Sequence, residues 1–249
     1  IKKRFGQMGL SGAGIQSDDT APTGTVGVSL GKHGIPEYVI HENVAWDYIE
    51  AGRDALNRVR AADAVCFGSL AQRHEVSRQS IRRLLSSASA NAWRVFDVNL
   101  RQGFFDRETI EHSLKLANVL KLNDHELTVL AGMFAIAGDG REQIKTLAIR
   151  FGLQVVALTY GADGSLLYRN GGWARSSAVA VTIKDTVGAG DAFTAALCLG
   201  LLRNLDLDEI NRAANRIAAY VCSCSGATAA VPVELLRLLN PATAVRAQA

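Results

Sequence analysis

The chain has 249 residues, of which 48% are apolar and 20% charged, and this composition excludes a collagen repeat, a disordered polymer and a coiled coil. Two independent domains would each be small at this length, so we expect essentially one α/β core. The net charge of +3 is mild and the basic residues are scattered among carboxylates, so we expect no nucleic-acid partner.

The chain opens with residues that have the pattern of the end of a helix. Ile1 is not an initiator residue, so we expect the chain to begin inside a longer domain. From Thr23 to His41 apolar and polar residues alternate, and the segment Gly31-Lys32-His33-Gly34 supplies turn residues. This pattern predicts a two-stranded ribbon.

The densest group of basic residues falls on a helical pattern. We expect these arginines to form the solvated face of a helix, because a phosphate-binding surface needs clustered charge and stacking aromatic residues. The basic residues are Arg73, Arg78, Arg82 and Arg83, and the expected apolar face consists of Val76, Ile81, Leu84 and Leu85.

Short apolar runs of β-prone residues then alternate with helical segments. The four runs are Ala64–Phe67, Arg94–Val98, Val119–Leu122 and Val155–Thr159. Strands this apolar are covered on both faces, so the alternation predicts a mostly parallel sheet with helices on both sides. Two further strands are expected at Ser165–Arg169 and Trp173–Val181, and the pattern after Gly190 is helical as far as Leu239.

Polar residues and glycines follow each apolar run, and in a parallel sheet ligands bind outside the carboxyl ends of the strands. Asn123 alone would be explained as a helix cap, and Gly161 and Gly164 as turn residues. Their recurrence at one predicted edge favours a binding site, and Arg101 beside glycine-rich turns suggests an anionic ligand. Asp97, Asn99 and Arg101 stand at alternate positions, which share one face of an extended segment. The full set is Gly68, Ser69, Asp97, Asn99, Arg101, Asn123, Glu126, Thr159, Gly161 and Gly164.

The sharpest signal is the segment Asp185–Phe193, DTVGAGDAF. Its glycines open a long apolar helix, so the amides of Gly188, Ala189 and Gly190 are free to bind an anion at the positive helix end. Phe193 replaces the third small residue of a dinucleotide fingerprint, Asp191 would repel a permanent pyrophosphate, and the chain contains no P-loop sequence. A phosphoryl group in transfer fits better, with Asp191 as the general base and the amides stabilising the charge.

The four cysteines, Cys66, Cys198, Cys222 and Cys224, form no CxxC pair and lie among apolar or small residues. We expect reduced, buried thiols and a cytoplasmic location. No apolar stretch approaches the length of a membrane span, so no membrane partner is expected.

At these residues the chain resembles the PfkB or ribokinase-like carbohydrate kinases. DTVGAGDAF is similar to the C-terminal signature of that family, LNDHE (Leu122 to Glu126) to its NxxE motif, and LTYGADG (Leu158 to Gly164) to its TxGxxG loop. DVNLR (Asp97 to Arg101) resembles a segment of fructokinase-like members. The resemblance covers nearly all of the chain from about Thr23 onward. It implies a three-layer ribokinase-like α/β fold with a mostly parallel central sheet, helices on both faces and a small β lid.

The resemblance further implies an ATP-dependent kinase that phosphorylates a sugar hydroxyl, fructokinase-like, with Asp191 as catalytic base, Gly188–Gly190 as anion hole and Arg101 assisting. Asn123 and Glu126 match residues that organise Mg²⁺ and the nucleotide phosphates, usually through water. Asp185 and the Val187 carbonyl resemble a site for a monovalent cation such as K⁺. The remaining matches are Thr159, Gly161 and Gly164 along the nucleotide, Asn215 and Gly226 near the adenine, and Gly68, Ser69, Asp97 and Asn99 toward the substrate.

The same resemblance divides the chain into three parts. Residues 1–22 would end an incomplete N-terminal βα region, residues 23–46 would form a lid that excludes water from the sugar, and residues 47–249 would form the nucleotide- and sugar-binding core. Lids of this family often pair between subunits, which implies a homodimer through the lid. Family members begin with a strand and a GG-containing segment that bind the sugar, and nothing of the kind precedes Lys2, so we expect a truncated chain.

Two other functions stay open. The first is a 2-keto-3-deoxysugar-acid kinase or a nucleoside kinase of the same family, in which Arg101 would bind a substrate carboxylate. The second is a non-catalytic remnant that binds nucleotide or sugar, which the missing start favours and the intact Asp191 opposes. The sequence does not identify the sugar.

Overall fold

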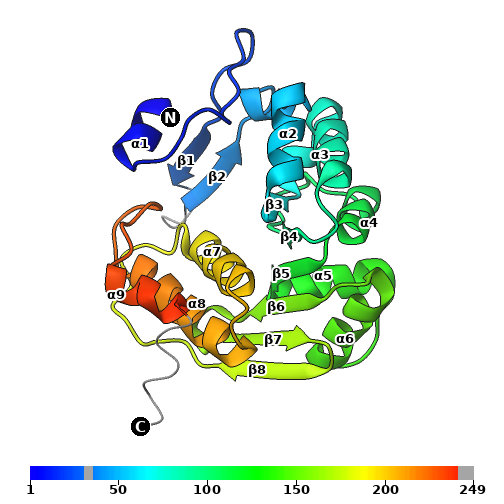
Figure 1. Ribbon diagram of the computed structural model, residues 1–249, viewed down its shortest axis with the longest axis vertical. Coiled ribbons are helices and arrows are strands. Elements are labelled where there is room, and N and C mark those ends of the chain that lie inside the picture. The colour runs from blue at the N-terminus through cyan, green and yellow to red at the C-terminus, as the bar shows by residue number, and fades with distance from the viewer. Residues whose placement is uncertain (31–35, 241–249) are drawn as a thin grey trace.

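The structure is a computed structural model that describes residues 1–30 and 36–240 (Figure 1). Its largest element is a six-stranded sheet with the order β3-β4-β5-β6-β7-β8. The first four strands run parallel and the last two pairings are antiparallel. The bounds are β3 (Ala64–Gly68), β4 (Trp93–Asp97), β5 (Val119–Asn123), β6 (Val155–Thr159), β7 (Ser165–Arg169) and β8 (Gly172–Ser176). The predicted mostly parallel sheet is therefore confirmed.

Helices cover both faces of this sheet, as the three-layer prediction requires (Figure 1). On one face lie α4 (Arg107–Leu116), α5 (Asp124–Phe134) and α6 (Gly140–Phe151), and on the other lie α7 (Ala189–Leu202) and α8 (Leu207–Cys222). The remaining helical segments are α1 (Lys2–Gln7), α2 (Arg53–Ala61), α3 (Glu75–Ser87), α9 (Val233–Leu236) and the 3₁₀ turns η2 (Ala45–Tyr48), η3 (Leu70–Gln72), η4 (Gly161–Asp163) and η5 (Arg237–Leu239).

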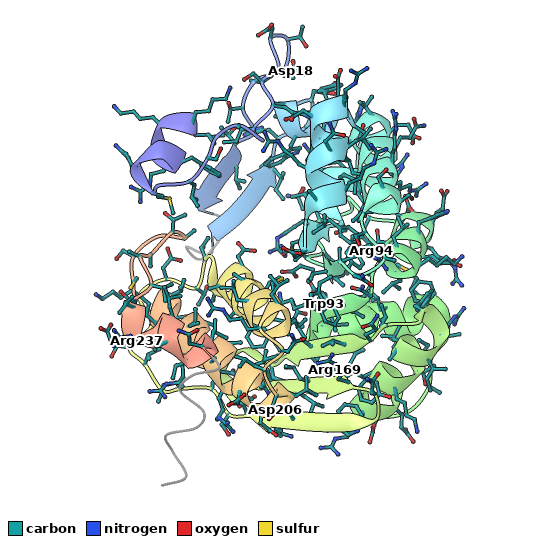
Figure 2. All side chains as sticks on the ribbon, viewed as in Figure 1. Asp18, Trp93, Arg94, Arg169, Asp206 and Arg237 are labelled. Carbon is teal, nitrogen blue, oxygen red and sulfur yellow. The ribbon has the colours of Figure 1, made fainter. Side chains whose placement is uncertain are left out.

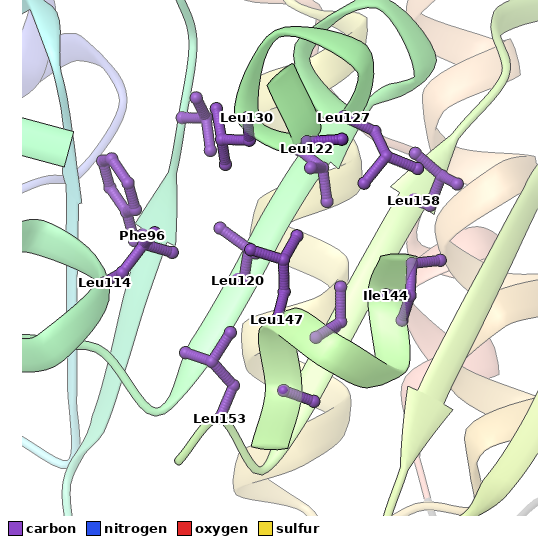
Figure 3. Packing of buried hydrophobic residues seen from close by; sticks show 14 of the residues in the cluster. Phe96, Leu114, Leu120, Leu122, Leu127, Leu130, Ile144, Leu147, Leu153 and Leu158 are labelled. Atoms are coloured by element: carbon purple, nitrogen blue, oxygen red, sulfur yellow. The ribbon is translucent and has the colours of Figure 1, made fainter. Parts of the chain in front are cut away.

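Side-chain alternation along the strands sorts residues between the two faces. On β5, Leu120 and Leu122 pack among the leucines of α5 and α6 (Figure 3). Val119 packs on the opposite face, in the cluster that contains Phe193 and Leu197 of α7. Because successive strand residues point to opposite faces, every second residue of β4, β5 and β6 is directed toward α7. This parity decides which polar residues reach the start of α7.

Strand β8 is shorter than the Trp173–Val181 strand that the alternation predicts, so that prediction is wrong in its extent. Ser176 is the last paired residue and lies opposite Ser165, the first residue of β7. The segment after Ser176 has no strand beside it, because the chain before Ser165 turns at Gly164. Residues 178–183 instead leave the sheet.

The predicted ribbon is present as a separate two-stranded sheet of β1 (Val26–Leu30) and β2 (Pro36–Ile40), paired antiparallel. Its predicted turn, Gly31 to Gly34, lies outside the described residues. Figure 1 places this sheet apart from the central one, near the start of the chain and α1. Val26 and Val39 have exposed side chains on it.

Two residues, Arg73 and Val76, differ from the prediction for the basic helix. Arg78, Arg82 and Arg83 lie on α3, but Val76 is 41% exposed and does not join its apolar face. Arg73 precedes the helix and is buried, with a side chain only 4% exposed, because it is paired with Asp47. The prediction of a solvated face is therefore wrong for Arg73.

On the rest of the surface, Figure 2 shows side chains that end in nitrogen and side chains that end in oxygen interspersed around the outline of the molecule.

The cysteines are all free thiols, but the prediction that all four are buried is wrong. Cys66 is exposed and the other three are partly exposed. Cys66 lies on β3, the edge strand of the described sheet, whereas α7 packs on β4. Desolvation raises the pKa of the partly buried Cys198 to about 11, so this thiol is protonated and unreactive at neutral pH.

Candidate active site

The segment before α7 forms a tight turn that requires glycine at position 188. Gly188 is the N-cap of α7 with φ of 86°, a conformation that L side chains rarely adopt. A Cβ built there would lie 2.5 Å from the carbonyl oxygen of Ala227. The turn therefore packs backbone to backbone against the loop that follows α8.

Free amide groups gather at the start of α7. The N–H groups of Gly188, Gly190 and Asp191 donate to no acceptor among the described residues, whereas the Ala189 N–H turns back to the Thr186 carbonyl at 3.3 Å. The Asp191 side chain, in the first turn of the helix, is exposed. We call the free N–H groups of Gly188, Gly190 and Asp191 the amide cup. It differs from the predicted anion hole, because Asp191 contributes an N–H and that of Ala189 is engaged.

Asp185 connects two loops that the sequence separates by forty-one residues. Its Oδ1 accepts the Val187 N–H at 2.9 Å, and its Oδ2 accepts the Gly226 N–H at 3.2 Å. The structure therefore brings Gly226 close to the start of α7.

A cavity of about 480 Å³ opens beside this turn. Several residues predicted to bind the nucleotide or the phosphoryl group line this cavity. They are Thr159, Gly161, Gly164, Ala189, Gly190 and Asn215. One wall is apolar and comes from the segment after β8, which the sequence reasoning missed: Ala178, Val179, Ala180, Val181 and Ile183. The alternation of small apolar residues in this segment was the available signal, and we interpreted it as a strand.

Asn215 lies against the cavity on a buried polar network. Its Nδ2 donates to Ser165 Oγ at 2.6 Å and to the Asn211 carbonyl at 2.8 Å, and the Asn211 side chain in turn donates to the Ala174 carbonyl at 2.9 Å. This network joins α8 to β7 and β8, so it fixes the helix face that forms the floor of the cavity.

Asn123 and Glu126 form a capping box at the start of α5. Asn123 Oδ1 accepts the Glu126 N–H at 2.8 Å, and Glu126 Oε2 accepts the Asn123 N–H at 2.9 Å. The other carboxylate oxygen of Glu126 accepts the Leu100 N–H at 3.0 Å, and the side chain is 2% exposed. Glu126 thereby joins the loop after β4 to the end of β5.

The prediction that Asp97, Asn99 and Arg101 share one face of an extended segment is wrong, because the loop after β4 is not extended. Strand β4 ends at Asp97, and Asn99 takes a left-handed φ of 50°. Arg101 is exposed and donates to the Leu100 carbonyl at 2.9 Å. Ser69, 1% exposed, donates to the Val98 carbonyl at 2.7 Å, and a Cβ on Gly68 would lie 3.1 Å from the Asp97 carbonyl. Gly68 and Ser69 therefore hold the ends of β3 and β4 together.

Asp97 lies beneath the start of α7. Its Oδ1 accepts from Lys121 Nζ at 3.0 Å, and its Oδ2 accepts from Thr194 Oγ1 at 2.8 Å. The carboxylate predicted to contact the substrate is 6% exposed and has a protein partner on each oxygen. The sequence reasoning missed Lys121, although a lysine in a strand of leucine and valine is itself a signal.

A buried ion pair holds the root of the ribbon. Arg73 donates through Nε and Nη2 to the two carboxylate oxygens of Asp47, each at 2.8 Å, and through Nη2 to the His41 carbonyl at 2.6 Å. Its guanidinium lies over the rings of Trp46 and Phe104, 5.5 and 4.7 Å from their centroids. Desolvation favours a higher pKa for Asp47, but the bonds from Arg73 and the Val44 amide outweigh it, so the pKa lies below its ordinary value.

None of the described helices is both long and apolar enough to cross a membrane. Within residues 1–30 and 36–240, no three His, Cys, Asp or Glu side chains gather in a way that would hold a metal ion.

Known proteins are similar to this chain over most of its length. The sugar kinase PH1459 of Pyrococcus horikoshii is 29% identical over 222 residues, which are 86% of this chain and 67% of that protein. Its structure in complex with ATP has a TM-score of 0.75 and 27% identity, covering 90% of this chain and 72% of that one. The fructokinase of Escherichia coli is 27% identical over 230 residues, which are 88% of this chain and 73% of the relative.

A further solved structure is aminoimidazole riboside kinase from Salmonella enterica, complexed with aminoimidazole riboside and an ATP analogue. It has a TM-score of 0.78 and 25% identity, covering 96% of this chain and 80% of that one. The profile of the pfkB family of carbohydrate kinases matches residues 1–234. With the fold, the glycine turn and Asp191 in place, this match shows that the chain belongs to the pfkB family of carbohydrate kinases.

Proposed function

We propose that the chain transfers the γ-phosphoryl group of ATP to a sugar hydroxyl, as a fructokinase-like kinase, with Asp191 as general base. The observation that carries this proposal is the start of α7: Gly190, whose N–H has no acceptor among the described residues, lines a cavity of about 480 Å³, and the exposed Asp191 is the next residue of the helix. A general base has to be accessible, and an anion hole has to present free donors. Both conditions are met within a few residues.

The cavity supports ATP as the phosphoryl donor. Its volume lies in the range typical of small-molecule sites, and its apolar wall at residues 178–183 suits a flat base. Gly161 has open space where a Cβ would stand and allows close backbone approach, whereas the same space at Gly164 is filled by the Ser176 carbonyl. We propose that Thr159, Gly161 and Gly164 lie along the nucleotide and that Asn215 and Gly226 lie near the adenine. The structure of the similar PH1459 in complex with ATP supports ATP as the ligand of this chain.

In the proposed reaction Asp191 accepts the proton of the sugar hydroxyl. A bond forms between that hydroxyl oxygen and the γ-phosphorus while the bond to the β-phosphate oxygen breaks, and ADP leaves. The free amides of Gly188, Gly190 and Asp191, with the positive end of α7, stabilise the charge on the transferring group. We propose that Arg101 acts on the same phosphates, and that Gly68, Ser69 and Asn99 form the substrate edge.

Magnesium bound with the nucleotide would neutralise and orient the phosphates. Glu126 suits an indirect role, because both carboxylate oxygens already accept backbone N–H groups and the side chain is 2% exposed. We propose that Asn123 and Glu126 meet Mg²⁺ through water. At Asp185 and the Val187 carbonyl, the described residues do not fit a K⁺ site, because they offer one carboxylate whose two oxygens already accept backbone N–H groups.

Glu126→Gln is expected to raise the Mg²⁺ concentration needed for half-maximal activity and to lower the free energy of unfolding by about 1–3 kcal/mol. The Asn123 and Leu100 N–H groups are accepted by different carboxylate oxygens, and glutamine replaces one of these oxygens with an NH₂ group, so one of the two N–H groups would face a donor. Magnesium titration of activity and urea denaturation measure the two effects.

Glu142 provides the matched control for this substitution. It forms the same capping box with Asp139 at the start of α6, on the surface. Glu142→Gln is expected to leave the magnesium dependence unchanged. If Glu126→Gln also leaves it unchanged, Glu126 is only a helix cap.

The proposed activity is tested by measuring ATP consumption against a panel of acceptors that contains fructose, other sugars, a 2-keto-3-deoxysugar acid and adenosine. We expect the highest kcat/KM with a neutral sugar such as fructose. Preference for the keto acid would indicate that Arg101 binds a substrate carboxylate, and preference for adenosine would indicate a nucleoside kinase. Binding of ATP without consumption in the presence of any acceptor would contradict catalysis and favour the non-catalytic alternative.

The proposal includes the division of the chain into residues 1–22, a lid at residues 23–46 and a core at residues 47–249. The antiparallel β1-β2 ribbon supports a lid, because it stands apart from the central sheet and its root is held by Arg73 (Figure 1). The homodimer through this lid, the absence of nucleic-acid and membrane partners and the cytoplasmic location stay predictions.

A further inference from the structure

A lysine is buried in the middle of the central sheet. Lys121 is 7% exposed on β5, between Leu120 and Leu122, which are both fully buried. Burying an ammonium group is costly even when it is paired, and apolar residues of similar volume stabilise such positions equally well. The position of Lys121 therefore calls for an explanation other than stability.

Parity and register direct Lys121 toward the start of α7. It shares the face of Val119, which packs with α7, and it lies directly opposite Asp97 of β4 in the parallel register. Its Nζ donates to Asp97 Oδ1 at 3.0 Å. A Cβ built on Gly190 would lie 3.2 Å from the same Nζ, so the ammonium group adjoins the backbone of the amide cup.

This position is electrostatically unfavourable in the absence of an anion. The start of a helix carries a partial positive charge, so a buried cation there is repelled by the helix dipole. Asp97 offsets the repulsion, and Thr194 fixes the other oxygen of that carboxylate at 2.8 Å. For a negative charge that enters the cup, the field of the ammonium group adds to that of the helix and is partly opposed by the Asp97 carboxylate, so the attraction is that of an ion pair whose positive end adjoins Gly190.

We propose that Lys121 is a positioning residue for phosphoryl transfer: its buried ammonium group, held by Asp97 beneath Gly190, strengthens the field of the amide cup on the transferring group. Thr194 connects the pair to the helix, because its hydroxyl also lies 3.0 Å from the Gly190 carbonyl. The inference rests on the proposed function of the cup and adds a source for its charge. It also implies that the pair serves the cup and not the stability of the fold.

The test compares the wild type, Lys121→Met and the double variant Lys121→Met with Asp97→Leu. The single variant leaves Asp97 buried without a cation, so it is expected to be unstable. The double variant removes both charges, and Thr194 keeps the Gly190 carbonyl as an acceptor. Its unfolding midpoint is expected to stay close to that of the wild type. Its kcat is expected to fall about tenfold, with the KM for ATP changed less than twofold.

Binding measurements separate this role from a structural one. Affinity for adenosine is expected to be unchanged in the double variant, whereas affinity for ADP with aluminium fluoride is expected to fall about tenfold, because only the latter places negative charge in the cup. Neither ligand includes the sugar, so the contrast does not depend on the predicted substrate contact of Asp97. Lys115→Met, which removes an exposed lysine paired with Glu111, is the control and should change none of these values.

The outcomes are distinct. Unchanged kcat and unchanged affinity for ADP with aluminium fluoride in the double variant would overturn the proposal, and so would failure of the double variant to fold, which would assign the pair to stability. If the wild type phosphorylates no acceptor, the proposed function fails. The contrast between ADP with aluminium fluoride and adenosine then still decides whether Lys121 contributes to the anion site.

Discussion

Asp191→Asn is expected to lower kcat by about 10² or more while leaving the affinity for ATP nearly unchanged. Asparagine keeps the shape of the side chain but cannot accept a proton from the sugar hydroxyl. The exposed position of Asp191 in the first turn of α7 means that the substitution disturbs no packed neighbour. Steady-state turnover and calorimetric titration with ATP measure the two quantities on the same sample.

Asp208 supplies the control for Asp191. It is an exposed aspartate in the first turn of α8, so Asp208→Asn removes the same interaction between a carboxylate and a helix start, away from the cavity. This variant should keep the turnover of the wild type. Wild-type turnover in Asp191→Asn would remove Asp191 from the mechanism and with it the central step of the proposed function.

Arg73→Met is expected to lower the free energy of unfolding by about 3–5 kcal/mol, because it leaves the Asp47 carboxylate buried without its cation. The two side chains are 4% and 2% exposed, so water cannot replace the lost bonds. Urea denaturation at neutral pH measures the change. A loss below about 1 kcal/mol would mean that the pair behaves like a surface salt bridge.

The exposed pair of Arg58 and Asp54 gives the comparison. Their side chains are 50% and 73% exposed, and Arg58→Met is expected to cost about 0–1 kcal/mol. The pH dependence carries the same information. Since the folded-state pKa of Asp47 is lowered, the contribution of the pair is complete above the ordinary aspartate pKa, about 3.9, and is lost as the pH falls through the lower folded value. Arg73→Met should remove this acid-dependent part of the stability.

The loss of Arg73 also bears on the lid. Arg73 donates to the carbonyl of His41, the residue directly after β2. Its removal therefore frees the base of the ribbon and also leaves Asp47 without its cation. In Arg73→Met protein we therefore expect amide exchange to increase in residues 40–48 before the central sheet opens.

Local patterns predicted most of the sheet. The apolar runs that became β3 to β6 were identified within one or two residues, because strands covered on both faces have to be almost wholly apolar. The length of β8 was not predictable in this way. An alternating segment pairs only as far as its neighbour extends, and β7 begins at Ser165.

The candidate site also has a part that the sequence predicted and a part that it did not. The glycine turn and Asp191 were identified from sequence because their chemistry lies within nine consecutive residues, Asp185–Phe193. Asn123 and Glu126 were also identified, but the bond from Leu100 to Glu126 was not, since it joins the loop after β4 to the start of α5.

The sequence alone determined the order of strands and helices, the two apolar faces of the sheet and the glycine-opened start of α7, since each depends on residues a few positions apart. The tertiary structure alone decided that Arg73 is buried against Asp47, that Lys121 and Asp97 meet beneath Gly190, and that residues 178–183 form a cavity wall. The physical reason is that periodicity fixes which way a side chain points, whereas the partner of a buried charge depends on which strands become neighbours and in which register.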